Sequence, residues 1–199
     1  FNCCLINLED MLANGTVVNG KMIESPKSFQ TACTITTQII AQVASGQFGG
    51  QSINGIDRIL APYVRKSFEK YLEASISDQL DIYGMEEANI EMAKKVAWKR
   101  TKREIKSGVQ TIQYQINTLM TTNGQAPFVT LFMYFDPEDE YAYEASLITE
   151  EILRQRIEGI KNKQGINVTP AFPKLVYVLD EHNIHEDSPY YYLTRLAAT

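Results

Sequence analysis

The chain has 199 residues, of which 44% are hydrophobic and 22% charged, a composition typical of globular proteins. Its net charge of −5 gives no indication of nucleic-acid binding, and no apolar run is long enough to span a membrane. Three cysteines are too few for a disulfide framework, and no secretory signal opens the chain, so we expect a reducing, cytoplasmic location.

The start of the chain predicts a core element at once. Position 1 is Phe, and residues 3–8 have the apolar character of a buried strand. Residues 13–20 contain two Asn-Gly pairs, which predict a surface hairpin or loop. Because natural domains seldom begin inside a core strand, we expect the chain to be an internal piece of a longer protein.

Two helices are expected next. Ser25-Pro26 is typical of a helix start, with Ser as N-cap and Pro at the first helical position. Apolar residues at spacings of three and four continue this helix until glycines end it at positions 46, 49 and 50. A second helix is predicted to begin after Ser52 or Asn54 and to continue to about Leu72, with Pro62 in or near its first turns or at a kink.

The second half alternates helices with strands. Residues 85–121 predict a long helix that could break near Gly108, and residues 128–135 predict a strand buried on both faces. Asp136-Pro137-Glu138 predicts the start of another helix, residues 173–179 a second buried strand, and Asp187-Ser188-Pro189 the cap of a final helix. This alternation favours an α/β fold with a largely parallel sheet.

Four segments carry residues with possible chemistry, and each also has a purely structural interpretation. Cys3 and Cys4 are either small core residues or a redox or radical thiol beside its packed neighbour, because adjacent side chains of a strand point to opposite faces. Residues 94–106 are a basic run, opposed by Glu104, that suits a solvated helix face or a phosphate-binding face. Residues 117–125 suit a helix end with a turn, or a polar loop at a pocket mouth. Residues 182–187 contain two histidines, but their spacing matches no zinc motif and favours a polar loop.

An ordered set of short motifs covers nearly the whole chain and resembles the anaerobic (class III) ribonucleotide reductases, a family of glycyl-radical enzymes. The motifs are Phe1-Asn2-Cys3-Cys4-Leu5-Ile6-Asn7-Leu8, Pro26-Lys27-Ser28, Gln38-Ile39-Ile40-Ala41-Gln42-Val43-Ala44-Ser45, Gly49-Gly50, Ile56-Asp57, Leu60-Ala61-Pro62-Tyr63-Val64, Asn117-Thr118-Leu119, Asn123-Gly124-Gln125, Pro127-Phe128-Val129-Thr130 and Phe172-Pro173-Lys174-Leu175-Val176. No single motif is decisive, but the ordered set is specific.

The resemblance implies a fold and a reaction. It implies that residues 1–199 form the N-terminal part of a catalytic ten-stranded α/β barrel of the glycyl-radical and ribonucleotide-reductase type, which is helix-rich in this part. It implies a homodimer that reduces ribonucleoside triphosphates to deoxyribonucleoside triphosphates. In the family's pattern the residue matching Cys3 lies inside the barrel beside the substrate ribose and takes part in removing the 2′-hydroxyl.

Further sites are implied by the same resemblance. A dNTP effector site at the dimer interface, built on helices at about residues 25–75, would involve Glu24, Lys27, Gln38 and Lys70. A lysine and a helix N-terminus both suit a phosphate group. Substrate contacts are expected from Asn117, Asn123 and Gln125, and no metal ligand is expected in this chain.

Other parts of the family's machinery are expected outside these residues: a regulatory ATP domain, the thiyl-radical loop, and a C-terminal glycyl-radical loop with zinc-binding cysteines. A radical-SAM activating enzyme containing an iron–sulfur centre would install the radical, and the chain alone is expected to be inactive. Two alternatives stay open: a non-catalytic nucleotide-binding or dimerisation module, and a different glycyl-radical enzyme with the same barrel. Neither a nucleic acid nor a membrane is expected as a partner.

Overall fold

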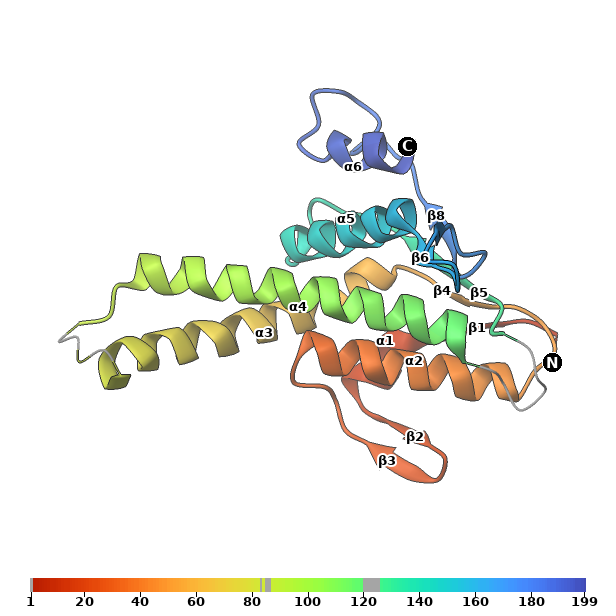
Figure 1. Cartoon of the computed structure of the whole chain (residues 1–199), viewed down its shortest axis with the longest axis horizontal. Coiled ribbons are helices and arrows are strands. Elements are labelled where there is room, and N and C mark those ends of the chain that lie inside the picture. The colour runs from red at the N-terminus through yellow and green to blue at the C-terminus, as the bar shows by residue number, and fades with distance from the viewer. Residues whose placement is uncertain (1, 83, 85–86, 120–125) are drawn as a thin grey trace.

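The computed structural model describes residues 2–82, 84, 87–119 and 126–199 and is built around a four-stranded parallel sheet (Figure 1). The strands are β1 (Cys4–Leu5), β4 (Gln51–Ile53), β5 (Val129–Met133) and β8 (Lys174–Tyr177), and they lie in that order. Helices lie between successive strands of the sheet, as parallel pairing requires. The predicted α/β class with a parallel sheet is therefore confirmed.

Helices make up most of the remaining structure. They are α1 (Leu8–Ala13), α2 (Phe29–Ser45), α3 (Ile56–Ser77), the π-helical turn η1 (Asp78–Ile82), α4 (Ile90–Thr118), α5 (Ala142–Glu158) and α6 (Tyr191–Ala197). Two hairpins are formed by β2 (Thr16–Val18) with β3 (Lys21–Ile23), and by β6 (Ile160–Lys161) with β7 (Asn167–Val168). The long helices α3 and α4 project together as an arm from the body (Figure 1). No helix of the described residues is both long and apolar enough to cross a membrane.

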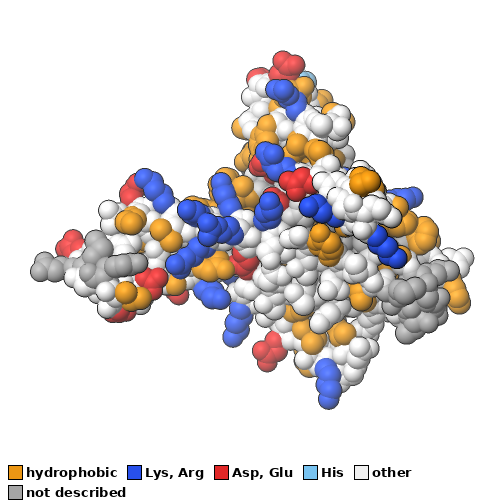
Figure 2. Space-filling model, in the orientation of Figure 1, with side chains coloured by type: hydrophobic (Ala, Val, Ile, Leu, Met, Phe, Trp, Pro, Cys, Tyr) orange, Lys and Arg blue, Asp and Glu red, His pale blue; other side chains and the backbone are white. Residues whose placement is uncertain are grey.

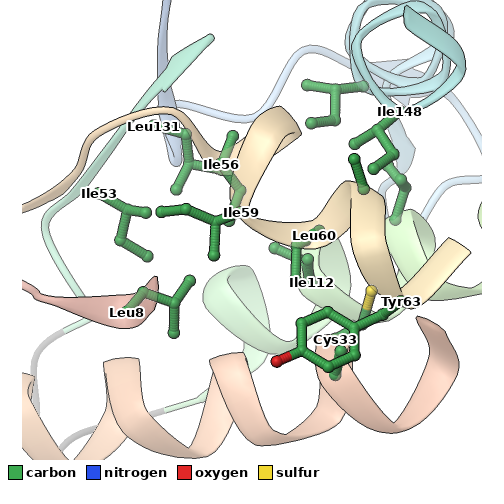
Figure 3. Packing of buried hydrophobic residues seen from close by; sticks show 14 of the residues in the cluster. Leu8, Cys33, Ile53, Ile56, Ile59, Leu60, Tyr63, Ile112, Leu131 and Ile148 are labelled. Carbon is green, nitrogen blue, oxygen red and sulfur yellow. The ribbon is translucent and has the colours of Figure 1, made fainter. Parts of the chain in front are cut away.

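The two faces of the parallel sheet differ in burial. Val129, Leu131 and Met133 of β5 point to one face and are almost completely buried, whereas Thr130 and Phe132 between them are half-buried on the other. On the buried face, α2 and α3 contact β4 and β5, and side chains from strands and helices fill the space between them (Figure 3). The helices thus cover one face of the sheet and leave the other open in the described part of the chain.

The start of α2 differs from the prediction. Its N-cap is Ser28, whose hydroxyl oxygen accepts a hydrogen bond from the backbone N–H of Thr31 at 3.3 Å, so the prediction of Ser25 as N-cap was wrong. Ser28 satisfies the same requirement three residues later, because any Ser with extended backbone before the first turn can cap it. The helix therefore begins after Lys27, which lies in the connection from β3.

Helix α4 continues through Gly108 without a break, so a break there is not observed. A Cβ atom at this position would lie 2.6 Å from a ring carbon of Phe29 and 2.8 Å from the sulfur of Cys33. The glycine is needed because α2 and α4 approach closely here. Cys33 is completely buried, as predicted, and burial raises the pKa of its thiol well above the usual value.

Several short elements were missed or misplaced. The strand predicted at residues 3–8 is only two residues long, because Leu8 begins the short helix α1. Strand β4 occupies residues assigned to the start of the second helix. Helix α5 begins at Ala142, since residues 136–141 form turns in which Asp136 and Asp139 accept backbone N–H groups. The final helix is present at Tyr191–Ala197.

Candidate functional site

Cys3 lies on the open face of the sheet, immediately before β1. Its side chain is exposed, whereas the neighbouring Cys4 is half-buried and packs against the hydrophobic core. Cys4 is fixed by its backbone N–H, which donates to the carbonyl oxygen of Gly50 at 3.1 Å. The two adjacent cysteines therefore point to opposite sides, as strand alternation predicted.

A hollow of about 460 Å³ lies over this open face beside Cys3. Its lining residues are Cys3, Cys4, Leu5, Ser52, Asn54 and Phe132. Leu5 and Ser52 are paired in the parallel register, so they share the face that carries Cys3. The hollow combines a thiol, a hydroxyl, an amide and an aromatic ring, which are groups that can hold a polar ligand against an apolar floor.

The backbone around Gly49 holds the approach to β1. Asn2 passes so close to Gly49 that a Cβ atom at Gly49 would overlap the backbone of Asn2. The side-chain amide of Gln47 donates to the carbonyl oxygens of Gly49 and Gly50, each at 3.3 Å. Since Gly50 in turn accepts the N–H of Cys4, this glycine pair determines where the chain on either side of Cys3 lies.

The four residues predicted to bind an effector nucleotide do not line a common cavity in this chain. Gln38 lies on the exposed side of α2, at a groove of about 550 Å³ between α2 and the β2–β3 hairpin. Glu24 and Lys27 are exposed in the connection that precedes α2, and Lys70 is exposed on α3. Lys27 precedes α2, and Gln38 lies about 14 Å along the helix axis from the first residue of α2, Phe29, at 1.5 Å per residue. A ligand that touches all four residues must therefore extend beyond the groove.

The N-terminus of α2 is already occupied by side chains of the protein. The backbone N–H of Phe29 donates to the hydroxyl of Ser67 at 2.8 Å, and that of Gln30 donates to the carboxylate of Glu104 at 2.9 Å. With the Ser28 cap, these bonds use the amides that a helix start offers to an anion. A phosphate beside Lys27 would consequently meet side chains, and the expected contribution of the free helix amides is absent.

Asn117, predicted to contact substrate, lies at the end of α4. Its side-chain amide donates to the carbonyl oxygens of Gln113 at 2.7 Å and Phe172 at 2.8 Å. These bonds connect α4 to the segment that enters β8, and they use both amide hydrogens. Asn123 and Gln125, the other two predicted substrate contacts, lie outside the described residues.

The two histidines form no metal site. In the described ranges, no three residues among His, Cys, Asp and Glu are grouped closely enough to hold a metal ion. His182 lies in an exposed loop, where its ring approaches Glu181 at 3.8 Å. The same loop is stabilised by Asn183, a fully buried residue whose amide donates to the carbonyl oxygen of Val178 at 2.9 Å. The segment is thus a polar loop held by hydrogen bonds of its own residues.

Comparison with known proteins adds the deciding observation, because all 199 residues match the family model described as anaerobic ribonucleoside-triphosphate reductase. The chain belongs to this family. It is 42% identical over 199 residues to the anaerobic ribonucleoside-triphosphate reductase of Escherichia coli (strain K12), a match that covers 99% of this chain and 25% of that protein. It is 36% identical over 197 residues to the enzyme of Enterobacteria phage T4, covering 98% of this chain and 30% of that protein.

A third relative, the anaerobic ribonucleoside-triphosphate reductase of Haemophilus influenzae, is 40% identical and is matched over 26% of its length. The chain thus spans between a quarter and a third of the curated relatives that it matches. The crystal structure of the anaerobic ribonucleotide reductase from Thermotoga maritima, in complex with dATP and CTP, matches with a TM-score of 0.52 and 12% identity. That match covers 78% of this chain and 26% of the other, and it shows a shared fold.

Membership of the anaerobic ribonucleoside-triphosphate reductase family confirms the resemblance drawn from the motifs. Sequence reasoning nevertheless missed the groups beside Cys3, namely Ser52, Asn54 and Phe132. The sequence predicts a helix start after Ser52 or Asn54, because β4 is only three residues long and shows no alternation of its own. The available sequence signal for Phe132 is the alternation of side chains along residues 128–135. Because this run is almost entirely apolar, the alternation does not show which face of the strand Phe132 occupies.

Proposed function

We propose that this chain is the N-terminal part of a catalytic ten-stranded α/β barrel that reduces ribonucleoside triphosphates to deoxyribonucleoside triphosphates by radical chemistry under anaerobic conditions. The observation that supports this most directly is the exposed Cys3 on the open face of a parallel sheet, in a chain that matches the reductase family along its whole length. The chain supplies one wall of the site, and by itself it is inactive.

Cys3 is the proposed catalytic residue of this wall. With the ribose of a substrate over the open face, the thiol can donate its proton to the 2′-hydroxyl oxygen as the carbon–oxygen bond breaks. Water then leaves and a thiolate remains on Cys3. An external two-electron reductant, formate or a thiol protein, supplies the electron pair and the hydrogen that form the new C2′–H bond, and a proton from solvent returns Cys3 to the thiol. Cys4 takes no part, because its side chain packs against the core.

Ser52 and Asn54 are proposed to orient the substrate beside Cys3. Both line the hollow, and their hydroxyl and amide groups can hydrogen-bond the hydroxyl groups of a ribose. Phe132 supplies an apolar surface on the same face. Holding the ribose in one orientation matters because a misplaced reacting atom loses much of the rate that proximity provides.

Effector binding is proposed at the groove between α2 and the β2–β3 hairpin. Gln38 lines this groove, and Glu24, Lys27 and Lys70 would contact parts of a dNTP that extend beyond it, with a second copy of the chain completing the site in a homodimer. The related Thermotoga maritima structure was solved with dATP and CTP, which supports sites for two nucleotides in the family. The two lysines provide the positive charge that phosphates require.

The radical-bearing and metal-bearing parts are proposed to lie in other segments, together with an ATP-binding regulatory domain. A glycyl radical, installed by a radical-SAM activating enzyme, supplies the one-electron chemistry of the reaction, and a zinc site accompanies it. The residues of this chain bind and orient substrate and deliver the proton from Cys3 Sγ. Oxygen destroys glycyl radicals, so the proposed activity requires anaerobic conditions.

Comparing the two adjacent cysteines tests the proposal. In the intact enzyme, activated without oxygen, we expect Cys3→Ser to abolish deoxynucleotide formation and Cys4→Ser to retain most of it. Both variants replace sulfur by oxygen, and they lie at adjacent positions. A loss of activity in Cys3→Ser alone is therefore caused by the side chain on the open face. A fully active Cys3→Ser enzyme refutes the assignment.

A further inference from the structure

The basic run on α4 takes no part in the proposed reaction and gives the chain a second functional surface. Residues 94–106 carry seven lysines and arginines and one carboxylate, a net charge of +6. Because the whole chain has a net charge of −5, the remaining residues have a net charge of −11. Such a separation of charge along the sequence favours association of the basic segment with partners of opposite charge.

The single carboxylate of the run does not neutralise this charge at the surface. Glu104 turns inward, where one oxygen accepts the N–H of Gln30 at 2.9 Å and the hydroxyl of Ser67 at 3.0 Å. Burial and the nearby Glu104 also raise the pKa of Tyr71 to about 12. The negative charge of Glu104, which the sequence led us to expect opposite the basic run, therefore points into the protein.

The cations themselves are largely free. Among the residues that the structure describes, Lys99, Lys102, Arg103 and Lys106 are exposed and form no ion pair. The ion pairs that the run does make, Lys95 with Glu91 at 3.9 Å and Arg100 with Asp78 at 3.8 Å, are long and solvent-exposed. Pairs of this kind contribute little and compete weakly with a new partner.

Helical geometry places three of these free cations in a row with Lys95, which makes only the weak exposed pair with Glu91. Lys95, Lys99, Lys102 and Lys106 are spaced by four, three and four residues, so they lie on one side of α4 over about 17 Å. With Arg103 beside them, they form what we call the basic face. Figure 2 shows lysine and arginine side chains gathered along α4.

The basic face leads into a polar hollow of about 380 Å³. Lys106, Gln110 and Tyr114 of α4 line it, together with Lys161 of the β6–β7 hairpin and the carboxylate Glu158 at the end of α5. Beside the basic face, the hollow therefore offers hydrogen-bonding groups and charges of both signs.

We propose that the basic face is a docking surface for an acidic polypeptide segment, with carboxylates repeating every three to four residues. Burying lysines against apolar groups is costly, so a partner must bring its own charges. Glutamates one helical turn apart on the partner match the spacing of the lysines, as in paired helices whose charged edges select partners.

The composition of the surface disfavours nucleic acid as the occupant. Single strands bind through aromatic side chains on which bases stack, in addition to positive charge. Trp98, the one aromatic residue in the run, is stacked on Phe68 with ring centroids 4.3 Å apart and meets Tyr143 edge-on at 5.0 Å. Its ring is occupied within the protein and offers no platform for a base.

The test measures binding of a fluorescent oligoglutamate peptide to the intact protein at low and at physiological ionic strength. We expect salt-sensitive binding, weakened about tenfold or more by the triple change Lys99→Gln, Lys102→Gln and Lys106→Gln. The matched control removes three cations elsewhere, Arg58→Gln, Lys163→Gln and Arg195→Gln, and should retain the affinity of the original protein. Thermal unfolding and far-ultraviolet circular dichroism verify that both triple variants are folded.

Three outcomes overturn the proposal. The first is no binding of the peptide at low ionic strength. The second is an equal loss in both triple variants, which would show that only the net charge matters. The third is tighter binding of a single-stranded oligonucleotide of equal charge than of the peptide, lost in the α4 variant, which would make the surface a nucleic-acid site.

Discussion

Replacing Gly108 by alanine tests the closest helix contact in the molecule. The added Cβ would meet Phe29 at 2.6 Å and Cys33 at 2.8 Å, both shorter than real side-chain contacts. Both neighbours belong to α2 and are completely buried. The N–H of Phe29 is also bound to Ser67, which holds its backbone, and the buried ring has no free space to turn into, so relieving the clash requires α2 or its neighbours to shift.

The sign of the effect follows from two opposing terms. Alanine is favoured over glycine inside a helix by about 1 kcal/mol. Overpacking a filled core costs about 1–3 kcal/mol, and here two contacts are violated against one rigid helix. We therefore expect Gly108→Ala to lower the free energy of unfolding by roughly 1–2 kcal/mol, which lowers the Tm by about 2–8 °C in a chain of this size.

Urea denaturation followed by circular dichroism measures this difference, with Ser107→Ala as the matched control. Ser107 is the exposed neighbour of Gly108, so alanine there improves helix propensity without a clash and should leave stability equal or slightly higher. Because α2 lines the groove at Gln38, Gly108→Ala should also weaken dNTP binding. A Gly108→Ala protein as stable as the original would refute the tight α2–α4 contact.

Three further predictions concern single positions. In the proposed homodimer, Lys27→Ala should weaken dNTP binding severalfold, since it removes one charge proposed to pair with a phosphate, and unchanged affinity by calorimetry would contradict it. Burial raises the pKa of the Asp57 carboxyl above 3.8, so the folded state binds the proton more tightly and stability should fall as pH rises from about 3.8 through that raised pKa. Asp57→Asn should remove this fall in urea titrations at several pH values, and an unchanged pH profile would exclude Asp57 as its source. Gly49→Ala should displace Asn2 and change the rate at which Cys3 is alkylated, whereas Gly50→Ala, whose Cβ has no neighbour nearer than 3.9 Å, should not; equal rates in both variants would contradict the close approach at Gly49.

The long elements of the fold were predictable because their patterns are long. Helices α2, α3 and α4 repeat apolar residues over many turns, and β5 lies in an almost unbroken apolar run, so each was expected near its observed place. The failures are short elements. Strand β4 has three residues, of which only Ile53 is apolar, and no periodicity can be read from so few positions. Its place is set by pairing with β1 and β5, which is a tertiary property.

The candidate site was predictable to a smaller extent. Strand alternation predicted that Cys3 and Cys4 lie on opposite faces, which the exposed Cys3 and the core-packed Cys4 confirm, and the family resemblance indicated which of the two packs. The partners of Cys3 were not predictable, because Ser52 and Asn54 come from a strand nearly fifty residues away that local pattern did not reveal. The role of Gly108 was not predictable for a related reason, because a glycine that breaks a helix and a glycine that lets another helix approach have the same local sequence signal.

In the described part of the chain, helices cover only one face of the sheet, and this supports the proposed barrel. All four strands are parallel, and parallel sheets are stable when both faces are covered. Here the open face carries the apolar side chain of Leu5, 68% exposed, and the half-buried ring of Phe132 beside the polar groups of Ser52 and Thr130. The outer strands β1 and β8 also present unpaired edges in the described chain, which invite further strands. In the proposed barrel, additional strands would pair with these edges and enclose the open face, and Cys3 would point into an interior protected from solvent.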